Sequence, residues 1–122
     1  MIDIQPGFTF LAPTPDCAYS HLYIVIAILS EDEVLWVSVT TQRDNSDTSC
    51  ILRAGDHPFI KNDSVVNYRD ADRKSADNLK EGIKRGLISP RPPLTNEVFE
   101  RVKEGAKGAY FMPMEFLKYF SV

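Results

Sequence analysis

The side chains best suited to proton transfer in this sequence are its two histidines, His21 and His57. Metal-free cleavage of RNA needs a base for the 2′-hydroxyl, a cation or donor for the charged phosphorane, and an acid for the leaving oxygen. Histidine suits either proton transfer because its charge changes near neutral pH. Arg43 could supply the electrostatic function through its bidentate guanidinium. Either histidine could instead be structural, and Arg43 could be a solvated loop charge.

A second cluster combines a carboxylate with a histidine in Asp56-His57-Pro58. The preceding Gly55 and the following proline indicate a shaped turn, and shaped loops often carry function. One interpretation is a small hydrolase built around Asp56 and His57. The alternative is a well-formed turn with a surface histidine.

Several other residues, together with Asp56, are candidates for binding RNA. Thr40 lies at the end of a predicted strand and could donate a hydrogen bond, although threonine is also a good strand former. Thr41 would point to the opposite face of that strand, and Gln42 follows in the loop. A basic rim is also conceivable, but its cations alternate with acids, as on a solvated surface. Its members include Arg69, Arg73 and Lys74.

No cofactor or metal site is predicted. Cys17 and Cys50 show neither a disulfide framework nor metal-ligand spacing, so we expect reduced thiols in a cytoplasmic protein. The histidines and cysteines lack ligand spacing, and there is no glycine-rich phosphate loop. The longest apolar run, Leu22 to Leu29, is too short to cross a bilayer, so we expect no membrane association.

Composition indicates one globular domain rather than a disordered chain. The 122 residues are 43% hydrophobic and 25% charged, with a formal net charge of −3. This charge argues against a generally basic nucleic-acid coat. Because the first 39 residues contain no lysine or arginine, a phosphate-binding surface must take its cations from later in the chain.

The order of elements predicts a mainly β fold with C-terminal helices, in which a small antiparallel barrel-like sheet precedes the helices. We divide the single domain, 1–122, into a β-barrel core (1–70), a helical part (71–109) and an aromatic tail (110–122). Thr95 is the expected N-cap of the second helix. The predicted strands are 7–11, 22–29, 34–41, 49–53 and 64–68, and the predicted helices are 75–85 and 95–108, joined by a stiff linker at 89–93.

Three stretches in this order resemble the PemK/MazF toxins, the ribonuclease halves of toxin–antitoxin pairs. They are Leu22 to Ile26, Val37 to Gln42 with an apolar–Thr–small–Gln pattern, and Lys61 to Val66. The resemblance covers roughly residues 6–107. It implies an SH3-like barrel with a short helix within 70–79, metal-independent cleavage of single-stranded RNA to a 2′,3′-cyclic phosphate and a 5′-hydroxyl, an acidic antitoxin segment as partner, and a homodimer.

The resemblance also suggests a site. Thr40 matches the hydroxyl residue of the family, while His21 stands where the family has its catalytic arginine, in Ala18-Tyr19-Ser20-His21. His21 and Thr40 would then act at the scissile phosphate, with His57 or Arg43 as helper. The missing arginine favours an alternative, a non-catalytic SH3-like barrel that binds protein or RNA and uses the aromatic tail for docking.

Overall fold

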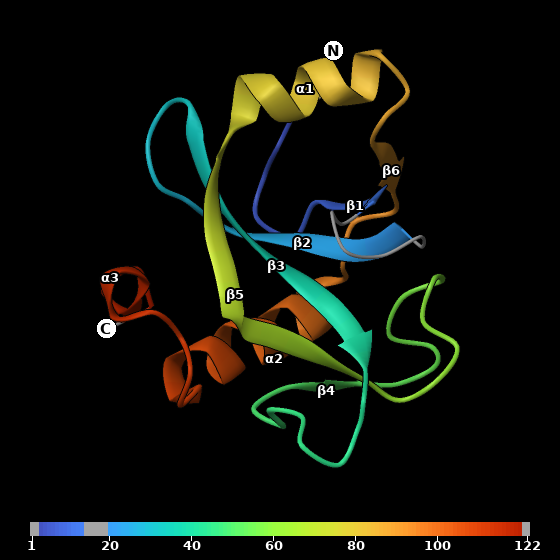
Figure 1. Cartoon of the computed structure of the whole chain (residues 1–122), viewed down its shortest axis with the longest axis vertical. Helices are drawn as coiled ribbons and strands as arrows, with labels where there is room; N and C mark the ends of the chain where they lie inside the picture. Colours follow the sequence, from blue (N-terminus) through green and yellow to red (C-terminus); the bar gives the residue numbers. More distant parts are fainter. Residues whose placement is uncertain (1–2, 14–19, 121–122) are drawn as a thin grey trace.

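The described residues, 3–13 and 20–120 of a computed structural model, form one curled antiparallel sheet of six strands that resembles half of a barrel (Figure 1). The elements are β1 (Thr9–Pro13), β2 (Ser20–Ile28), β3 (Glu33–Thr41), β4 (Ile51–Leu52), β5 (Ser64–Ser75), α1 (Ala76–Lys84), β6 (Ser89–Arg91), α2 (Asn96–Gly108) and α3 (Met114–Leu117). The strand order is β4-β5-β3-β2-β1-β6. The prediction of a mainly β fold with C-terminal helices is confirmed at this level.

Strands β2 and β3 form the central hairpin and lie within two residues of their predicted bounds. Leu22 pairs with Val39, and both side chains are buried in the larger core cluster. Because side chains alternate along a strand, His21 and Thr40, one step outward, share the other face. The alternation of the hairpin therefore places these two polar side chains together at one end of the sheet.

Helix α2 covers one face of the sheet through Val98, Val102 and Ala106, the face that its periodicity predicts. The hydroxyl of Tyr68 on β5 donates a hydrogen bond of 2.7 Å to the Val102 carbonyl. Helix and sheet approach so closely that a Cβ on Gly105 would clash with the Tyr68 hydroxyl. Only glycine allows this separation at that position.

Both predicted helix starts are confirmed. The Thr95 hydroxyl accepts a hydrogen bond from the Val98 N–H, and the Ser75 hydroxyl caps α1 in the same way. Helix α1 buries Leu79 in a second cluster with Phe10, on the face of the sheet away from α2. The sheet is therefore covered on both faces.

Strand β5 is longer than predicted, and the short helix expected within 70–79 begins only at Ala76. The pairing of β3 with β5 shifts between Trp36, which pairs with Asp72, and Ser38, which pairs with Asn67. Beyond this irregularity the strand resumes and runs to Ser75. Its second half is mostly charged, so no apolar alternation marks it as a strand.

The predicted linker at 89–93 contains an edge strand. Residues of β6 pair with β1, and Pro90 lies opposite Phe10. Proline is tolerated there because an edge strand need not donate to a further neighbour. β1 itself lies two residues later than predicted, and β4 is shorter than its predicted range. The proposed 71–109 helical part therefore needs correction, since it contains the end of β5 and all of β6.

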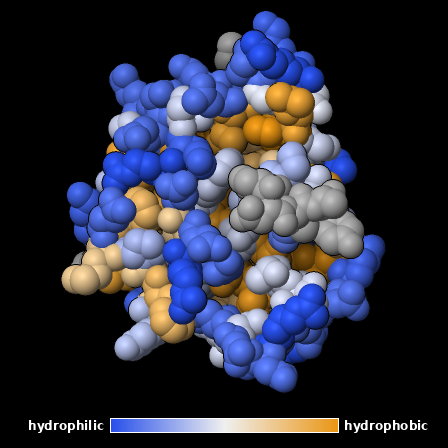
Figure 2. Space-filling view, viewed as in Figure 1, coloured by the Kyte–Doolittle hydropathy of each residue, from blue (hydrophilic) through white to orange (hydrophobic). Residues whose placement is uncertain are grey.

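The aromatic tail is partly core and partly surface. Phe116 and Phe120 are buried in the cluster that α2 covers. In contrast, Tyr110 is 88% exposed and Met114 is 85% exposed. Figure 2 shows apolar colour around α3, within a face that is otherwise mostly polar.

Candidate functional site

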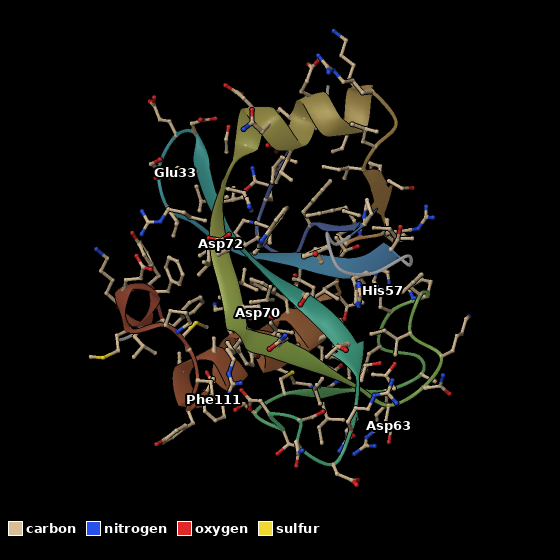
Figure 3. The ribbon with its side chains drawn as sticks, viewed as in Figure 1. Glu33, His57, Asp63, Asp70, Asp72 and Phe111 are labelled. Atoms are coloured by element: carbon tan, nitrogen blue, oxygen red, sulfur yellow. The ribbon has the colours of Figure 1, made fainter. Side chains whose placement is uncertain are left out.

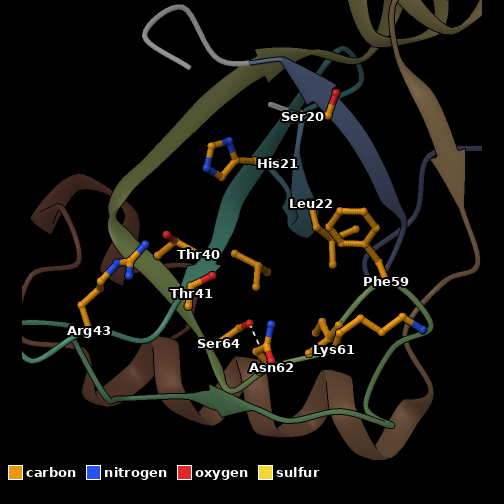
Figure 4. Close-up of a pocket in the computed structure, with 12 residues that line it drawn as sticks. Ser20, His21, Leu22, Thr40, Thr41, Arg43, Phe59, Lys61, Asn62 and Ser64 are labelled. Carbon is orange, nitrogen blue, oxygen red and sulfur yellow. Dashed lines mark hydrogen bonds between the residues drawn. The ribbon is translucent and has the colours of Figure 1, made fainter. Parts of the chain in front are cut away.

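A pocket of about 510 Å³ lies where β2 begins, β3 ends and β5 begins (Figure 4). We call it the His21 pocket. It brings together three predicted site residues, His21, Thr40 and Arg43, together with Thr41, which was predicted to bind RNA. The other lining residues are Ser20, Leu22, Val39, Phe59, Ile60, Lys61, Asn62 and Ser64.

His21 has the most distinctive environment in this pocket. Its imidazole is half-buried above Thr40 (Figure 4). The Nδ1 atom is buried, and it has no hydrogen-bond partner in the described part of the chain. An unpaired buried ring nitrogen costs free energy that a bound ligand would recover. This position is therefore suited to a proton donor or acceptor on a ligand.

The polar lining of the His21 pocket favours an anion. Arg43 and Lys61 contribute positive charge, and no aspartate or glutamate is among the described residues that line it. Hydroxyl groups from Thr40, Thr41 and Ser64 add hydrogen-bonding capacity. Ser64 also donates to the Asn62 carbonyl at 2.9 Å, which braces the turn that carries Lys61.

A second hollow continues from this pocket along the end of β3. It shares Thr41, Arg43 and Asn62 with the His21 pocket and adds Gln42. Asp44 and Asp63 also line it, so its charge is mixed. Gln42 is therefore next to the predicted site, and Arg43 stands where the two hollows meet.

His57, predicted as a catalytic helper, does not line the His21 pocket. It is 3% exposed. Its Nδ1 accepts a hydrogen bond of 3.0 Å from the Phe59 N–H, so Nε2 carries the proton. That Nε2 lies 2.8 Å from the Pro92 carbonyl and 3.0 Å from the Thr9 hydroxyl. The ring thus connects the 57–60 turn to β1 and to the end of β6.

The electrostatic environment of His57 agrees with a structural role. Burial, which is the largest cause, together with the charge of Arg91, lowers its pKa, against the opposing effect of the Pro92 hydrogen bond. A neutral imidazole with both nitrogens engaged is poorly placed to exchange protons with a ligand.

Asp56, predicted to bind RNA, is engaged in an ion pair with Arg101 of α2. The guanidinium contacts both carboxylate oxygens, at 3.0 and 3.1 Å, and its second nitrogen also donates to the Ile51 carbonyl. The hydrogen bond from Arg101 is the main cause that lowers the pKa of the Asp56 carboxyl. Because Asp56 and His57 have separate partners, they form no catalytic pair.

The predicted basic rim also lies elsewhere. Arg69 stacks over Phe111, with 4.1 Å between guanidinium carbon and ring centroid. Arg73 pairs with Glu115 at 2.8 Å, and Lys74 contacts Asp72 at 3.3 Å. Figure 3 shows Asp72 along β5, toward the end away from the pocket. Arg73 and Lys74 thus have acidic neighbours, Arg69 stacks on a ring, and none of the three lines the His21 pocket.

Sequence reasoning missed the part of the pocket that the turn before β5 supplies. Phe59, Lys61 and Asn62 all line it, although none of the three was predicted as a site residue. A signal was available, because Lys61 to Val66 is one of the three stretches that carry the resemblance.

The described residues contain neither a candidate metal site nor a candidate membrane span. Among the described residues, no group of three or more histidine, cysteine, aspartate or glutamate side chains could hold a metal ion. In the same part of the chain, no helix is long and apolar enough to span a membrane. Comparison with known proteins adds no identification: no protein-family model matches the sequence, and no curated protein matches it.

Proposed function

We propose that this protein is a metal-independent endoribonuclease that cleaves single-stranded RNA in the His21 pocket, in the manner of PemK/MazF toxins. One observation carries the proposal: His21, whose Nδ1 has no partner among the described residues, shares a pocket with Thr40, Arg43 and Lys61, and no described carboxylate lines that pocket. A phosphodiester needs this combination of a proton-transfer group, hydrogen-bond donors and positive charge.

The reaction needs no group outside this set. His21 takes the proton of a 2′-hydroxyl, and the resulting oxyanion attacks the adjacent phosphorus. Arg43 and the Thr40 hydroxyl stabilise the charge that develops on the non-bridging oxygens. The bond from phosphorus to the 5′-oxygen breaks, and the imidazolium returns its proton to that oxygen. The products are a 2′,3′-cyclic phosphate and a 5′-hydroxyl, and His21 ends the reaction in its starting protonation state.

Arg43 takes the place of the family's arginine in this proposal. It comes from the other side of the pocket, just after β3, whereas the family places its arginine before the strand that corresponds to β2. The resemblance further implies an SH3-like barrel, a homodimer, and an antitoxin with an acidic segment. The cytoplasm would be the place of action, since the RNA substrate is there.

The test is cleavage of a single-stranded RNA by purified protein in the presence of a chelator. We expect fragments that end in a cyclic phosphate, and we expect His21→Ala to abolish them. Arg85→Ala is a matched control for Arg43→Ala, because Arg85 lies beyond the end of α1 in an ion pair with Glu81. Equal activity of wild type and His21→Ala would contradict this assignment of the site.

A second candidate function is a non-catalytic module that binds protein or RNA. The exposed side chains of Tyr110 and Met114 favour it, because large apolar groups left in contact with solvent often mark docking surfaces. The double change Tyr110→Ser and Met114→Ser tests it without removing the buried Phe116. Intact RNA together with a partner lost from this variant would support the binding module over the enzyme.

A further inference from the structure

The turn that closes the His21 pocket carries an exposed aromatic ring. Phe59 is 42% exposed although phenylalanine is usually buried, and it lines the pocket across from Arg43 (Figure 4). Its neighbour Ile60 is buried in the larger core. The chain therefore anchors one apolar side chain of this turn and presents the next one to the pocket.

The backbone beneath Phe59 is held firmly. Its N–H donates to the His57 Nδ1 atom at 3.0 Å, and the Ile60 N–H donates to the His57 carbonyl at the same distance. The His57 ring is in turn fixed by Thr9 and Pro92. A ring on such a support loses little conformational freedom on stacking, which favours binding.

The residues that follow offer polar contacts of two kinds. Lys61 adds a flexible cation to the pocket, and Asn62 adds an amide with both donors and an acceptor. Aromatic stacking combined with positive charge is how proteins hold single-stranded nucleic acids. Amide groups read the hydrogen-bonding edges of bases that are not paired.

We propose that Phe59, Lys61 and Asn62 form a subsite for one unpaired nucleotide of the bound RNA. The base stacks on Phe59, its edge contacts the Asn62 amide, and an adjoining phosphate contacts Lys61. This inference rests on the proposed function, because it assumes that RNA enters the His21 pocket. His57 is a positioning residue in this arrangement, since it holds the backbone of the stacking residue.

The experiment uses a short single-stranded oligonucleotide with 2′-O-methyl groups, which cannot be cleaved because the attacking hydroxyl is blocked. One abasic position is moved along it, and affinity is measured for the wild type, Phe59→Leu and Leu87→Ala. Leu87 is the matched control because it is an exposed apolar residue outside the described pocket lining. Phe59→Leu keeps an apolar side chain at an exposed position, so the fold should survive, as circular dichroism would show.

We expect one abasic position to weaken wild-type binding by roughly 5- to 150-fold, the range of a lost base–aromatic stack. Phe59→Leu should lose this penalty, whereas Leu87→Ala should keep it. Lys61→Ala should weaken binding of all sequences and reduce the salt slope by about one. Asn62→Ala should change the preference among bases at that one position.

Two different failures are distinguishable. An abasic penalty of equal size in the wild type and in Phe59→Leu, with tight binding of the intact strand, would overturn the subsite and leave the proposed function standing. No binding of any oligonucleotide to the wild type would overturn both. As a second measurement, the added fluorescence of Phe59→Trp should be quenched by the strand, whereas that of Leu87→Trp should not.

Discussion

The two histidines of this chain occupy opposite kinds of environment. His21 lies at the start of β2 with a buried ring nitrogen that has no partner within the described residues, beside hydroxyls and cations in an open pocket. His57 is almost fully buried, and both of its ring nitrogens have partners. The same side chain thus keeps an unsatisfied ring nitrogen in one place and supports a turn in the other. What separates them is whether the described residues satisfy both nitrogens of the imidazole.

The two ends of β5 show the same contrast for cations. Near Ser64 the pocket holds Arg43 and Lys61 without an acid among its described lining residues. Toward Ser75, Arg73 and Lys74 lie next to Glu115 and Asp72. The cations of the His21 pocket therefore meet no acid within its described lining, although Asp44 and Asp63 line the adjoining hollow.

The largest expected effect is on catalysis, and it follows from a change at His21. His21→Ala should lower the rate of RNA cleavage by about 10²- to 10⁴-fold, the usual contribution of a general acid or base. Its unfolding midpoint in urea should stay close to that of the wild type, because no described hydrogen bond of Nδ1 is lost. Rates measured on a labelled single-stranded RNA, alongside a urea titration, check both statements. A large loss of stability with unchanged cleavage would reverse the comparison between the two histidines.

The next largest expected effect is on stability, and it follows from a change at His57. His57→Ala should lower the free energy of unfolding by about 1–3 kcal/mol, because the buried Thr9 hydroxyl and Phe59 N–H lose a partner. Chemical denaturation measures this. His57→Gln is the matched variant, because a glutamine amide can still donate toward the Pro92 carbonyl, so it should be less destabilised. Equal stability of all three proteins would show that the hydrogen bonds of His57 contribute nothing to stability.

A smaller effect concerns the cations. Arg43→Ala should weaken binding of an uncleavable single-stranded oligonucleotide by about tenfold and reduce the salt slope by about one, because one phosphate contact is lost. Arg73→Ala should leave both values unchanged, since Arg73 faces Glu115 and Glu33 at the far end of β5. Fluorescence anisotropy at several salt concentrations checks the pair. Equal losses in the two variants would place RNA on the far end of β5 as well.

Much of the fold was predictable from local patterns, and some of the site was too. The apolar alternation of β2 and β3 sets their register, and that register is what brings His21 next to Thr40. The capping serines and threonines fix where α1 and α2 begin. In contrast, the second half of β5 and the edge strand β6 depend on backbone pairing with distant strands, which leaves no mark on side-chain periodicity.

The roles of His57 and Asp56 were beyond sequence reasoning for a related reason. Their partners, Pro92 for the histidine and Arg101 for the carboxylate, are 35 and 45 residues away along the chain. Adjacent positions in sequence suggested a shared site, but in the turn the two side chains serve different contacts. Only the three-dimensional arrangement shows which polar groups are already satisfied.

The smallest expected effect is the pH dependence of stability that His57 produces. Burial lowers the pKa of folded His57 below its usual 6.5, so the unfolded chain takes up a proton first as the pH falls. Its contribution to stability is therefore complete above about pH 6.5 and decreases as the pH falls toward the lower folded pKa. The loss cannot exceed about 1.4 kcal/mol per pH unit for one proton. The charge of Arg91 also lowers this pKa.

Urea unfolding of the wild type and His57→Gln between pH 7.5 and about pH 5 isolates this term. The wild type should lose stability over that interval, and the glutamine variant should lose less. His21 is present in both proteins, so its contribution cancels in the difference. Asp56, whose folded pKa is lowered below 3.8, affects stability only at more acidic pH. Parallel curves for the two proteins would mean that His57 takes up a proton as readily in the folded chain as in the unfolded one. Burial and the hydrogen bonds of the imidazole would then not keep it neutral.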